Sequence, residues 1–497
     1  MTRAQDWDDT LSDLARRRHR TFAMGGQDRL AAHHAKGKLD ARTRIERFLD
    51  PGSFRELGTL VGGEVPADGI VVGSGHVNGT PVMVGAEDFT TVAGTIGAGS
   101  NSKRHRIAEL ACQNKVPLVM LLEGAGFRPG KHGGRSPTDL IAQARCSGQV
   151  PTVAAVLGPS AGHGALVAPV CDFRIMNADG AIFTAGPPVV KESTGEEVSK
   201  EELGGPQVAI PSGVIHNVAD DDAAALEEIR RYLSYFPPSA WSYPPSRPAD
   251  QSTLPRSTPE LLEIVPRDNR RGYDVRAVIS AVADRPDWFE VQPGYGRSIV
   301  CALAHLGGHP VAVVANQPNV MAGAIDSDAA DKAAHFIMVA DSFHLPIIFL
   351  ADNPGMLPGS RSERSGILRN GARMFAAQTL ATTIKLHLTL RKAYGFGSMV
   401  MSLLGFDQQV ATFGYPGATM GAMSAAALSR ASNADVDATA LLRDAELQAS
   451  FTSAETLGFD ELIDPHETRD ALLAALQRGL QSRQAAAEPV RRTGILP

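Results

Sequence analysis

The sequence predicts an α/β protein made of two tandem copies of one domain, and three observations carry this prediction. Short apolar runs, typical of buried strands, alternate with longer segments rich in Ala, Leu, Lys and Arg, which favour helices. Turn residues separate these segments. Features of the first half also recur 229 residues later, with Pro81 matched by Pro310 and Lys103 by Lys332. A repeat of this length indicates duplicated domains rather than a solenoid.

The elements follow one another in each half in the order strand, strand, helix. Asn78-Gly79 predicts the turn of a hairpin over residues 76–85. The expected helices cover residues 12–20, 28–38 and 104–115 in the first half and 328–343 in the second. The expected buried strands cover residues 116–122, 150–157, 345–351 and 384–390. An α/β architecture built from ββα units follows from this order.

A proline-rich segment marks the middle of the chain, with seven prolines between Phe236 and Glu260. Proline at that density is incompatible with the interiors of helices and sheets. We therefore expect a linker there, which separates an N-terminal domain over residues 1–245 from a C-terminal domain over residues 246–497.

The composition bounds the kind of protein. A chain of 497 residues with a hydrophobic fraction of 43% can bury large cores, and a net charge of −6 excludes a globally basic nucleic-acid binder. The N-terminus carries acidic residues where a signal peptide needs basic and apolar ones. No stretch approaches the ~18 uninterrupted apolar residues of a membrane span. We expect a soluble, cytoplasmic protein that binds neither nucleic acid nor membrane.

The cysteines and histidines predict no metal centre. The four cysteines are far apart in the sequence, and no pair has the CxxC spacing of a zinc ribbon or of a dithiol redox motif. The sequence also lacks a P-loop, a GxGxxG fingerprint and an HExxH zinc motif. We expect free thiols at Cys112, Cys146, Cys171 and Cys301.

Glycine-rich turns are the candidate chemical feature. Residues 158–164 follow the expected strand 150–157, and residues 395–397 follow the expected strand in the second half. A helix that opens after such a turn has unpaired amides at its start, and two of them can hold an oxyanion such as an enolate. The alternative is that the glycines serve only to pack helix against strand. The presence of two equivalent turns favours the functional interpretation.

The sequence also resembles a known family, the carboxyltransferase β subunit of biotin-dependent acyl-CoA carboxylases. The resemblance covers nearly the whole chain, from His34 to about Asp464, and its segments are specific only in combination. These segments are residues 34–45, 49–54, 67–75, 88–90, 158–162, 186–196, 202–205, 212–221, 233–235, 273–276, 314–318, 331–334, 354–359 and 390–395.

The resemblance implies two tandem crotonase-like domains of the ClpP/crotonase spiral type. It implies a homohexamer, a trimer of dimers, whose partner is an α subunit that carries biotin carboxylase and the biotin carboxyl carrier. The N-terminal domain would bind acyl-CoA and the C-terminal domain would receive carboxybiotin, with no metal in this subunit. Each half would stabilise one enolate, which explains why the domain is duplicated.

Residue roles follow from the matching positions. The resemblance assigns the acyl-CoA oxyanion hole to Gly162, His163 and Gly164, and the biotin oxyanion hole to Gly395, Phe396 and Gly397. It assigns CoA binding to Lys103, Arg106, Gly124, Ala125, Gly126 and Arg128. The alternatives are a solvated helix face for Lys103 and Arg106 and an ion pair for Arg128. Met399 is a candidate for the acyl pocket or for the core.

The sequence departs from the family pattern where it has Gly162-His163 and Gly395-Phe396 in place of two double glycines. Backbone amides survive a change of side chain, so both holes can persist. Two other functions remain open. One is a biotin-dependent decarboxylase or transcarboxylase subunit, because the half-reaction is reversible. The other is a non-catalytic scaffold subunit of the same fold, which the bulky residues at 163 and 396 would favour.

Overall fold

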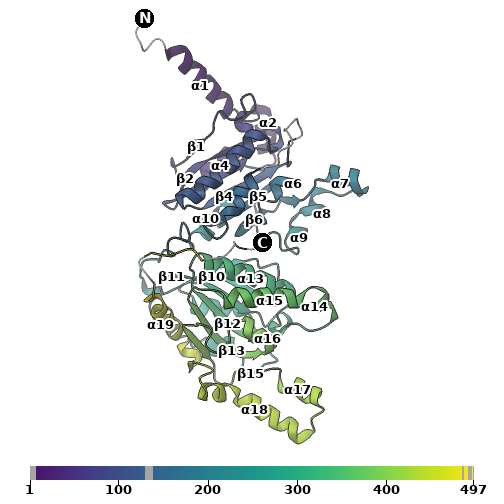
Figure 1. The fold of residues 1–497 in the computed structure, drawn as a ribbon, viewed down its shortest axis with the longest axis vertical. Coiled ribbons are helices and arrows are strands. Elements are labelled where there is room, and N and C mark those ends of the chain that lie inside the picture. Colours follow the sequence, from purple (N-terminus) through teal and green to yellow (C-terminus); the bar gives the residue numbers. More distant parts are fainter. Residues whose placement is uncertain (1–6, 129–137, 484–485, 491–494, 496–497) are drawn as a thin grey trace. The chain divides into compact units, whose positions relative to one another are not determined.

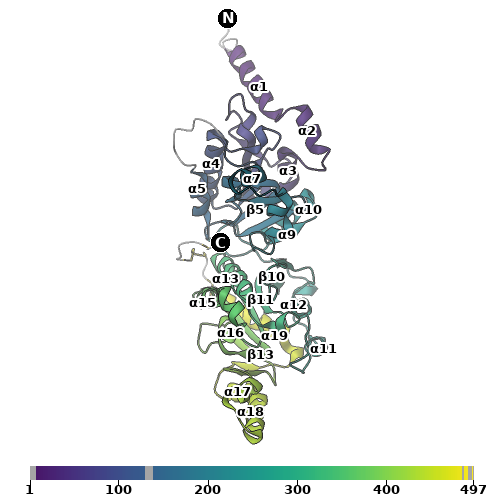
Figure 2. The same cartoon turned by 90° about the vertical axis from the view of Figure 1, so that its right-hand side faces the viewer.

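The computed structural model describes residues 7–128, 138–483, 486–490 and 495, and the chain divides into two compact units. Unit 1 contains residues up to Ser234 together with the C-terminal end, and unit 2 runs from Tyr235 to Arg491. Figures 1 and 2 show that each unit is a sheet covered by helices. No helix in the described ranges is long and apolar enough to cross a membrane.

Unit 1 is built on an eight-stranded sheet in the order β1-β2-β3-β4-β5-β6-β8, with β7 paired to β5. The ladders from β3 to β8 are parallel, and β1, β2 and β3 are antiparallel. The strands are β1 (Arg55–Leu57), β2 (Ile70–Val77), β3 (Thr80–Glu87), β4 (Leu118–Gly124), β5 (Thr152–Ala161), β6 (Phe173–Asn177), β7 (Ala181–Phe183) and β8 (Asn217–Ala219). All seven residues of β4 are buried, as expected for a central parallel strand.

The helices of unit 1 connect these strands. The α-helices are α1 (Asp8–Phe22), α2 (Gln27–His34), α3 (Ala41–Phe48), α4 (Ala98–Asn114), α5 (Asp139–Cys146), α6 (Gly162–Ala165), α7 (Pro187–Thr194), α8 (Lys200–Gly204), α9 (Pro206–Ala209) and α10 (Asp222–Leu233). Two short 3₁₀ segments, η2 (Pro66–Gly69) and η3 (Val92–Gly94), precede β2 and α4. Helices α4 and α5 lie side by side, and α4 also packs on β2 and β3.

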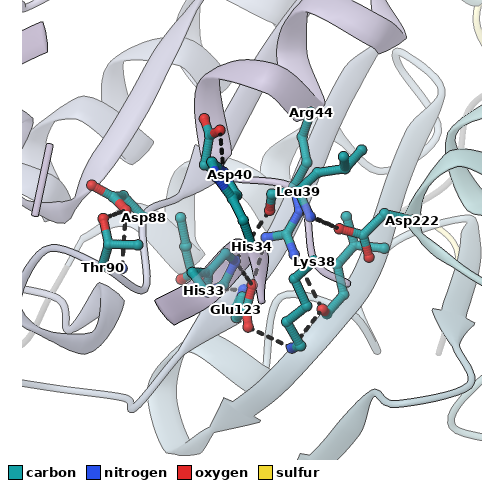
Figure 3. A network of polar contacts seen from close by, with 12 residues as sticks. His33, His34, Lys38, Leu39, Asp40, Arg44, Asp88, Thr90, Glu123 and Asp222 are labelled. Atoms are coloured by element: carbon teal, nitrogen blue, oxygen red, sulfur yellow. Dashed lines mark hydrogen bonds and ion pairs between the residues drawn. The ribbon is translucent and has the colours of Figure 1, made fainter. Parts of the chain in front are cut away.

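A buried ion network ties the N-terminal helices to the end of β4 (Figure 3). The Glu123 carboxylate lies 2.6 Å from Lys38 Nζ and 2.7 Å from Arg44 Nη1, and Arg44 Nε donates to Asp222 at 2.8 Å. Arg44 and Glu123 have almost no exposed surface. Removal of one partner from such a buried pair leaves an uncompensated charge and costs about 3–5 kcal/mol. The network therefore fixes the segment that contains the first motif of the family resemblance.

Unit 2 repeats this sheet in the order β16-β14-β13-β12-β11-β10-β9, with β15 paired to β13. Its strands are β9 (Phe289–Val291), β10 (Ile299–Leu306), β11 (His309–Asn316), β12 (Ile347–Asn353), β13 (Lys385–Tyr394), β14 (Ala411–Gly414), β15 (Thr419–Gly421) and β16 (Glu461–Leu462). β9, β10 and β11 pair antiparallel, and the ladders from β11 to β16 are parallel. The core of unit 2 includes buried residues of β10–β13 such as Val300, Val313, Leu350 and Leu388.

The helical elements of unit 2 are η4 (Gln251–Thr253), α11 (Leu261–Ile264), α12 (Val275–Val282), η5 (Met321–Gly323), α13 (Ser327–Ser342), α14 (Ser360–Arg364), α15 (Ile367–Thr379), α16 (Gly395–Val400), α17 (Ala425–Ser432), α18 (Val436–Glu455), η6 (Pro465–Glu467) and α19 (Thr468–Leu480). Asp326 caps α13 by accepting from the amide of Ala329 at 2.9 Å. Helices α17 and α18 pack on each other, as Figure 2 shows at the end of the unit.

The predicted repeat is confirmed element by element. The hairpin β2–β3 recurs as β10–β11, η3 as η5, α4 as α13 and β4 as β12 at a shift of 229 residues, and β5 recurs as β13 at a shift of 233. The expected turn at Asn78-Gly79 has the positive φ angles of 51° and 77° that a two-residue hairpin requires. Its amides bind the Asp50 carboxylate, and the amides of Gly307 and Gly308 bind Asp284 in the same way.

The division between the units falls before the proline-rich segment, and not within it as expected from the sequence. Residues from Tyr235 onward pack with unit 2, where the Phe236 ring meets Phe343 edge-on and the Ala240 carbonyl contacts His344 Nε2 at 2.8 Å. A high density of proline predicts an irregular path of the backbone. It does not predict whether the segment is buried in unit 1 or in unit 2. Ile495 belongs to unit 1, where its amide donates to Ser147 Oγ.

Candidate active site

The first glycine turn lies where β5 ends and α6 begins. Ala161 is in extended conformation, and Gly162, the next residue, has a φ of +54°, in the left-handed region that favours glycine. The chain thus reverses sharply and enters α6 with Gly162, His163 and Gly164 as its first residues. Gly164 is buried against Glu87 of β3, because a Cβ added there would lie 3.4 Å from Glu87 Oε1.

The second turn has the same backbone geometry in unit 2. Tyr394 at the end of β13 is extended, and Gly395 has a φ of +53° at the start of α16. A Cβ at Gly397 would lie 2.3 Å from Asn353 Oδ1 and 2.7 Å from the Cα of Gly355, so no larger residue fits there. The two units therefore present one turn conformation at equivalent strand ends.

The chemistry available at each turn is that of backbone amides. The first N–H groups of a helix have no acceptor within the helix, and a turn after a parallel strand aims them beyond the end of the sheet. Rigid amide donors stabilise developing negative charge on oxygen without reorganisation during the reaction. Each turn is therefore suited to hold an enolate or a tetrahedral oxyanion.

The side chain of His163 is hydrogen-bonded to a buried network of ionisable groups. Its Nε2 lies 2.6 Å from Asp139 Oδ1, and Asp139 Oδ2 accepts from Arg104 Nε at 2.8 Å. Arg104 also pairs with Glu87, whose second oxygen accepts the amide of Glu123 at 2.8 Å. Burial opposes ionisation of Asp139, yet hydrogen bonds from His163 and Arg104 lower its pKa, whereas burial raises the pKa of Glu87. The family resemblance assigned a role only to the backbone amide of His163 and not to its side chain.

Phe396 contacts neighbouring hydrophobic side chains. Its ring lies 5.8 Å from the ring of Phe375 on α15 and covers Gly371 of the same helix. Met399, one turn further along α16, is partly buried, and its carbonyl accepts from Gln378 Nε2 at 3.0 Å. Residues 396 and 399 thus line the contact between α15 and α16.

The two basic residues predicted for CoA on α4 lie in different environments. Lys103 is 4% exposed, and its ammonium donates to the carbonyls of Ala67 and Ile70, while burial lowers its pKa to about 8. The Arg106 side chain is 55% exposed and lies 3.2 Å from Glu109. Of these two residues, Arg106 presents its charge at the surface, whereas Lys103 binds η2 and the first residue of β2.

The predicted CoA loop lies beside the first turn. The Ala125 amide donates to Ala93 in η3, and Gly126, with a φ of +84°, approaches the Ala161 carbonyl, which directly precedes Gly162. Arg128 forms an ion pair with Asp68 at 2.5 Å and donates to the Thr95 carbonyl at 2.8 Å. The ion pair that was the alternative for Arg128 is thus present, and its side chain remains 23% exposed.

A cavity of about 450 Å³ lies in unit 2 at the start of α13. Residues from η5, from the loop after β12 and from α14 form its walls, including Met321, Ser327, Pro358, Arg361 and Ser362. Pro358 and Gly359 occupy the positions that correspond to Pro129 and Gly130 in the first half of the sequence. The cavity therefore belongs to the part of unit 2 that corresponds to the candidate CoA side of unit 1.

Comparisons with known proteins agree with this duplicated fold. The family described as the carboxyl transferase domain matches residues 32–493. The methylmalonyl-CoA carboxyltransferase 12S subunit of Propionibacterium freudenreichii subsp. shermanii is 36% identical, over 98% of this chain and 97% of that protein. The propionyl-CoA carboxylase carboxyltransferase subunit of Haloferax mediterranei is 36% identical, over 99% of each.

Among solved structures, the transcarboxylase 12S hexamer with hydrolysed methylmalonyl-CoA bound matches with a TM-score of 0.90, at 34% identity over 98% of both chains. This match confirms the fold class predicted from the sequence, two tandem crotonase-like α/β domains. Because the family covers almost the whole chain, the protein belongs to the carboxyl transferase domain family.

Proposed function

We propose that this chain is the carboxyltransferase subunit of a biotin-dependent enzyme and moves a carboxyl group from carboxybiotin to the α-carbon of an acyl-CoA. The observation that carries the proposal is the pair of glycine turns, with φ of +54° at Gly162 and +53° at Gly395, at equivalent strand ends. A reaction with two successive enolates, one on each substrate, needs two such donor sites.

The turn of unit 1 would receive the thioester oxygen of acyl-CoA. Gly162, His163 and Gly164 supply its backbone donors, and residues 124–126 border the strand end beside them. Arg106, on the exposed face of α4, would contact a CoA phosphate. The relatives named for methylmalonyl-CoA and propionyl-CoA support a short acyl chain.

The turn of unit 2 would receive the ureido oxygen of biotin. Gly395, Phe396 and Gly397 supply the donors here, and the cavity of about 450 Å³ in the same unit has room for a small bicyclic ring. Among the described residues that line this cavity, Arg361 is cationic, and Asp326 and Asp328 are acidic. Biotin would arrive on a separate biotin carboxylase and carrier subunit.

The assembly in this proposal is a homohexamer, a trimer of dimers. Its support is the solved relative at 34% identity, the transcarboxylase 12S hexamer. Light scattering of the purified chain tests it, with a mass close to six times 52.6 kDa as the expected result. A monomeric mass at working concentration would contradict it.

The decisive experiment is carboxyl transfer with the purified chain, a biotin carboxylase and carrier protein, ATP and labelled bicarbonate. Acyl-CoA substrates from acetyl to long-chain are compared, and propionyl-CoA is expected to be carboxylated fastest. A complex that forms but transfers label to no acyl-CoA would instead support the scaffold interpretation. Release of CO2 from methylmalonyl-CoA without net carboxylation would support a decarboxylase.

A further inference from the structure

The His163 side chain is fixed in a way that its backbone role does not require. Its Nε2 is bonded to Asp139 Oδ1 at 2.6 Å, and Asp139 has no exposed surface. Among the described residues, no hydrogen bond is recorded for Nδ1, the ring nitrogen nearer to the backbone of the turn. The side chain itself is 15% exposed. The ring thus leaves Nδ1 for another partner, on the residue whose amide belongs to the proposed oxyanion hole.

The contacts of the buried carboxylates indicate where the proton is held. Both oxygens of Asp139 accept, from His163 and from Arg104, and both oxygens of Glu87 accept, from Arg104 and from the Glu123 amide. A protonated carboxyl group would need an acceptor for its own hydrogen, and the three contacts from Arg104 and the Glu123 amide are all from donors. His163 Nε2 is a fourth donor when the ring carries a hydrogen there, and both carboxyl groups are then ionised.

Charge balance then involves the imidazole. Glu87 and Asp139 contribute two negative charges and Arg104 one positive charge, all three almost fully buried. An unmatched buried charge is costly, and an imidazolium at His163 brings the net charge of the four side chains to zero. In that form Nε2–H donates to Asp139, and Nδ1–H is available to a ligand.

We propose that the His163 side chain, held by Asp139, is an additional cationic donor to the thioester oxygen of acyl-CoA as that oxygen becomes an enolate. The inference rests on the proposed function and goes beyond it, because the amides alone do not require a histidine. In this role the His163 side chain transfers no proton and does not act as a base. It gives the acyl-CoA half a charged donor that the biotin half, with Phe396, lacks.

The test compares His163→Asn, which keeps an N–H for Asp139 but cannot be cationic, with His163→Gly and Asp139→Asn. We expect His163→Asn to lower kcat by about 100-fold, the loss typical of one oxyanion donor, with a smaller change in KM for acyl-CoA.

A binding measurement separates this inference from the proposed function. A CoA analogue that presents a nitronate in place of the enolate should bind the wild type about 100-fold more tightly than His163→Asn, while CoA itself binds both equally. If the wild type carboxylates no acyl-CoA and does not bind the nitronate, the proposed function fails. If the wild type is active and His163→Asn matches its kcat and nitronate affinity, the cationic donor is wrong. Full kcat in His163→Gly, with gained activity on larger acyl groups, would also overturn it, because the ring would then only limit size.

Discussion

The Sγ atoms of Cys112 and Cys146 lie 3.0 Å apart, although 34 residues separate them in the sequence. Cys112 on α4 is partly exposed, Cys146 at the end of α5 is buried, and both are free thiols. Their hydrogen bond lowers the pKa of Cys112, which favours its thiolate. The spacing of cysteines in the sequence does not predict this contact, because the contact depends on how α4 and α5 pack.

We expect hydrogen peroxide to convert this pair to a disulfide. One peroxide takes two electrons and two protons from the two thiols, the S–S bond forms, and two water molecules leave. Peptide mass spectrometry without reduction should detect the linked pair, two hydrogens lighter than the thiols. Cys171 and Cys301, each buried, serve as internal controls and should stay reduced. A Cys112→Ser variant that still forms a Cys146 disulfide within the chain would contradict the pairing.

Acid should destabilise unit 2 through His387. Its Nδ1 contacts the Met401 carbonyl at 2.8 Å and its Nε2 contacts Thr389 Oγ1 at 2.7 Å, which suits a neutral ring. Burial lowers its pKa to about 4, below the ordinary value of 6.5. Above pH 6.5 the ring is mostly neutral in both the folded and the unfolded protein, so it does not change the free energy of unfolding. As pH falls from 6.5 towards 4, the unfolded chain binds a proton that the folded protein does not, and the free energy of unfolding decreases.

From pH 7 to pH 5 this loss amounts to about 2 kcal/mol for one histidine. Denaturant unfolding of wild type and His387→Gln at both pH values measures it as the difference between the two losses. The exposed His76→Gln variant is the matched control and should follow the wild type. Equal acid losses in all three proteins would show that His387 does not titrate on unfolding.

Gly397 should not tolerate alanine. The added Cβ would overlap Asn353 Oδ1 and the Cα of Gly355, so the turn of unit 2 must shift. A displacement of the donors by about 1 Å can reduce the rate by about 100-fold, and we expect a loss of that size in carboxyl transfer. Gly405→Ala, where the Cβ meets nothing within 4 Å, is the control and should keep wild-type activity. Equal activity of the two variants would remove Gly397 from the site.

Arg106 and Lys103 should respond differently to substitution. Removal of the exposed Arg106 charge in Arg106→Ala should weaken CoA binding by about tenfold in titration calorimetry at low salt, because a charged contact to phosphate is lost. Lys103→Met should leave CoA affinity unchanged. It should lower the free energy of unfolding by about 1–3 kcal/mol, because two buried carbonyls lose their donor. Weaker CoA binding in Lys103→Met, with unchanged CoA binding in Arg106→Ala, would instead place Lys103 in the CoA site.

Much of the fold could be predicted from the sequence, because local rules govern it. The hairpin turn at Asn78-Gly79 follows from the φ angles that glycine and asparagine tolerate, and the buried strands follow from uninterrupted apolar runs. The positions of the two glycine turns follow for the same reason. The boundary between the units did not follow from the sequence, because it depends on whether residues 235–245 are buried in unit 1 or in unit 2.

The electrostatics of the site were harder to predict. Helix α4 buries Ser100, Lys103, Arg104, Ile107, Ala108 and Ala111, a stripe with the spacing of one helix face. Its first half is polar, and both interpretations of Lys103 from the sequence, CoA binding and a solvated helix face, place its ammonium at the surface. The apolar residues that continue this helix face, Ile107, Ala108 and Ala111, were the signal in the sequence that Lys103 is buried. The partner of His163, however, is set by a contact between α5 and α6 that no local pattern contains.

The close match between the two turns has an evolutionary consequence. After an ancestral domain was copied, the backbone of each copy was retained while the residue after the first glycine diverged, to histidine at 163 and phenylalanine at 396. Each lineage of the domain could then specialise for its own half of the chemistry. Exchange of these two side chains within one polypeptide would reveal whether that specialisation lies in the side chains alone.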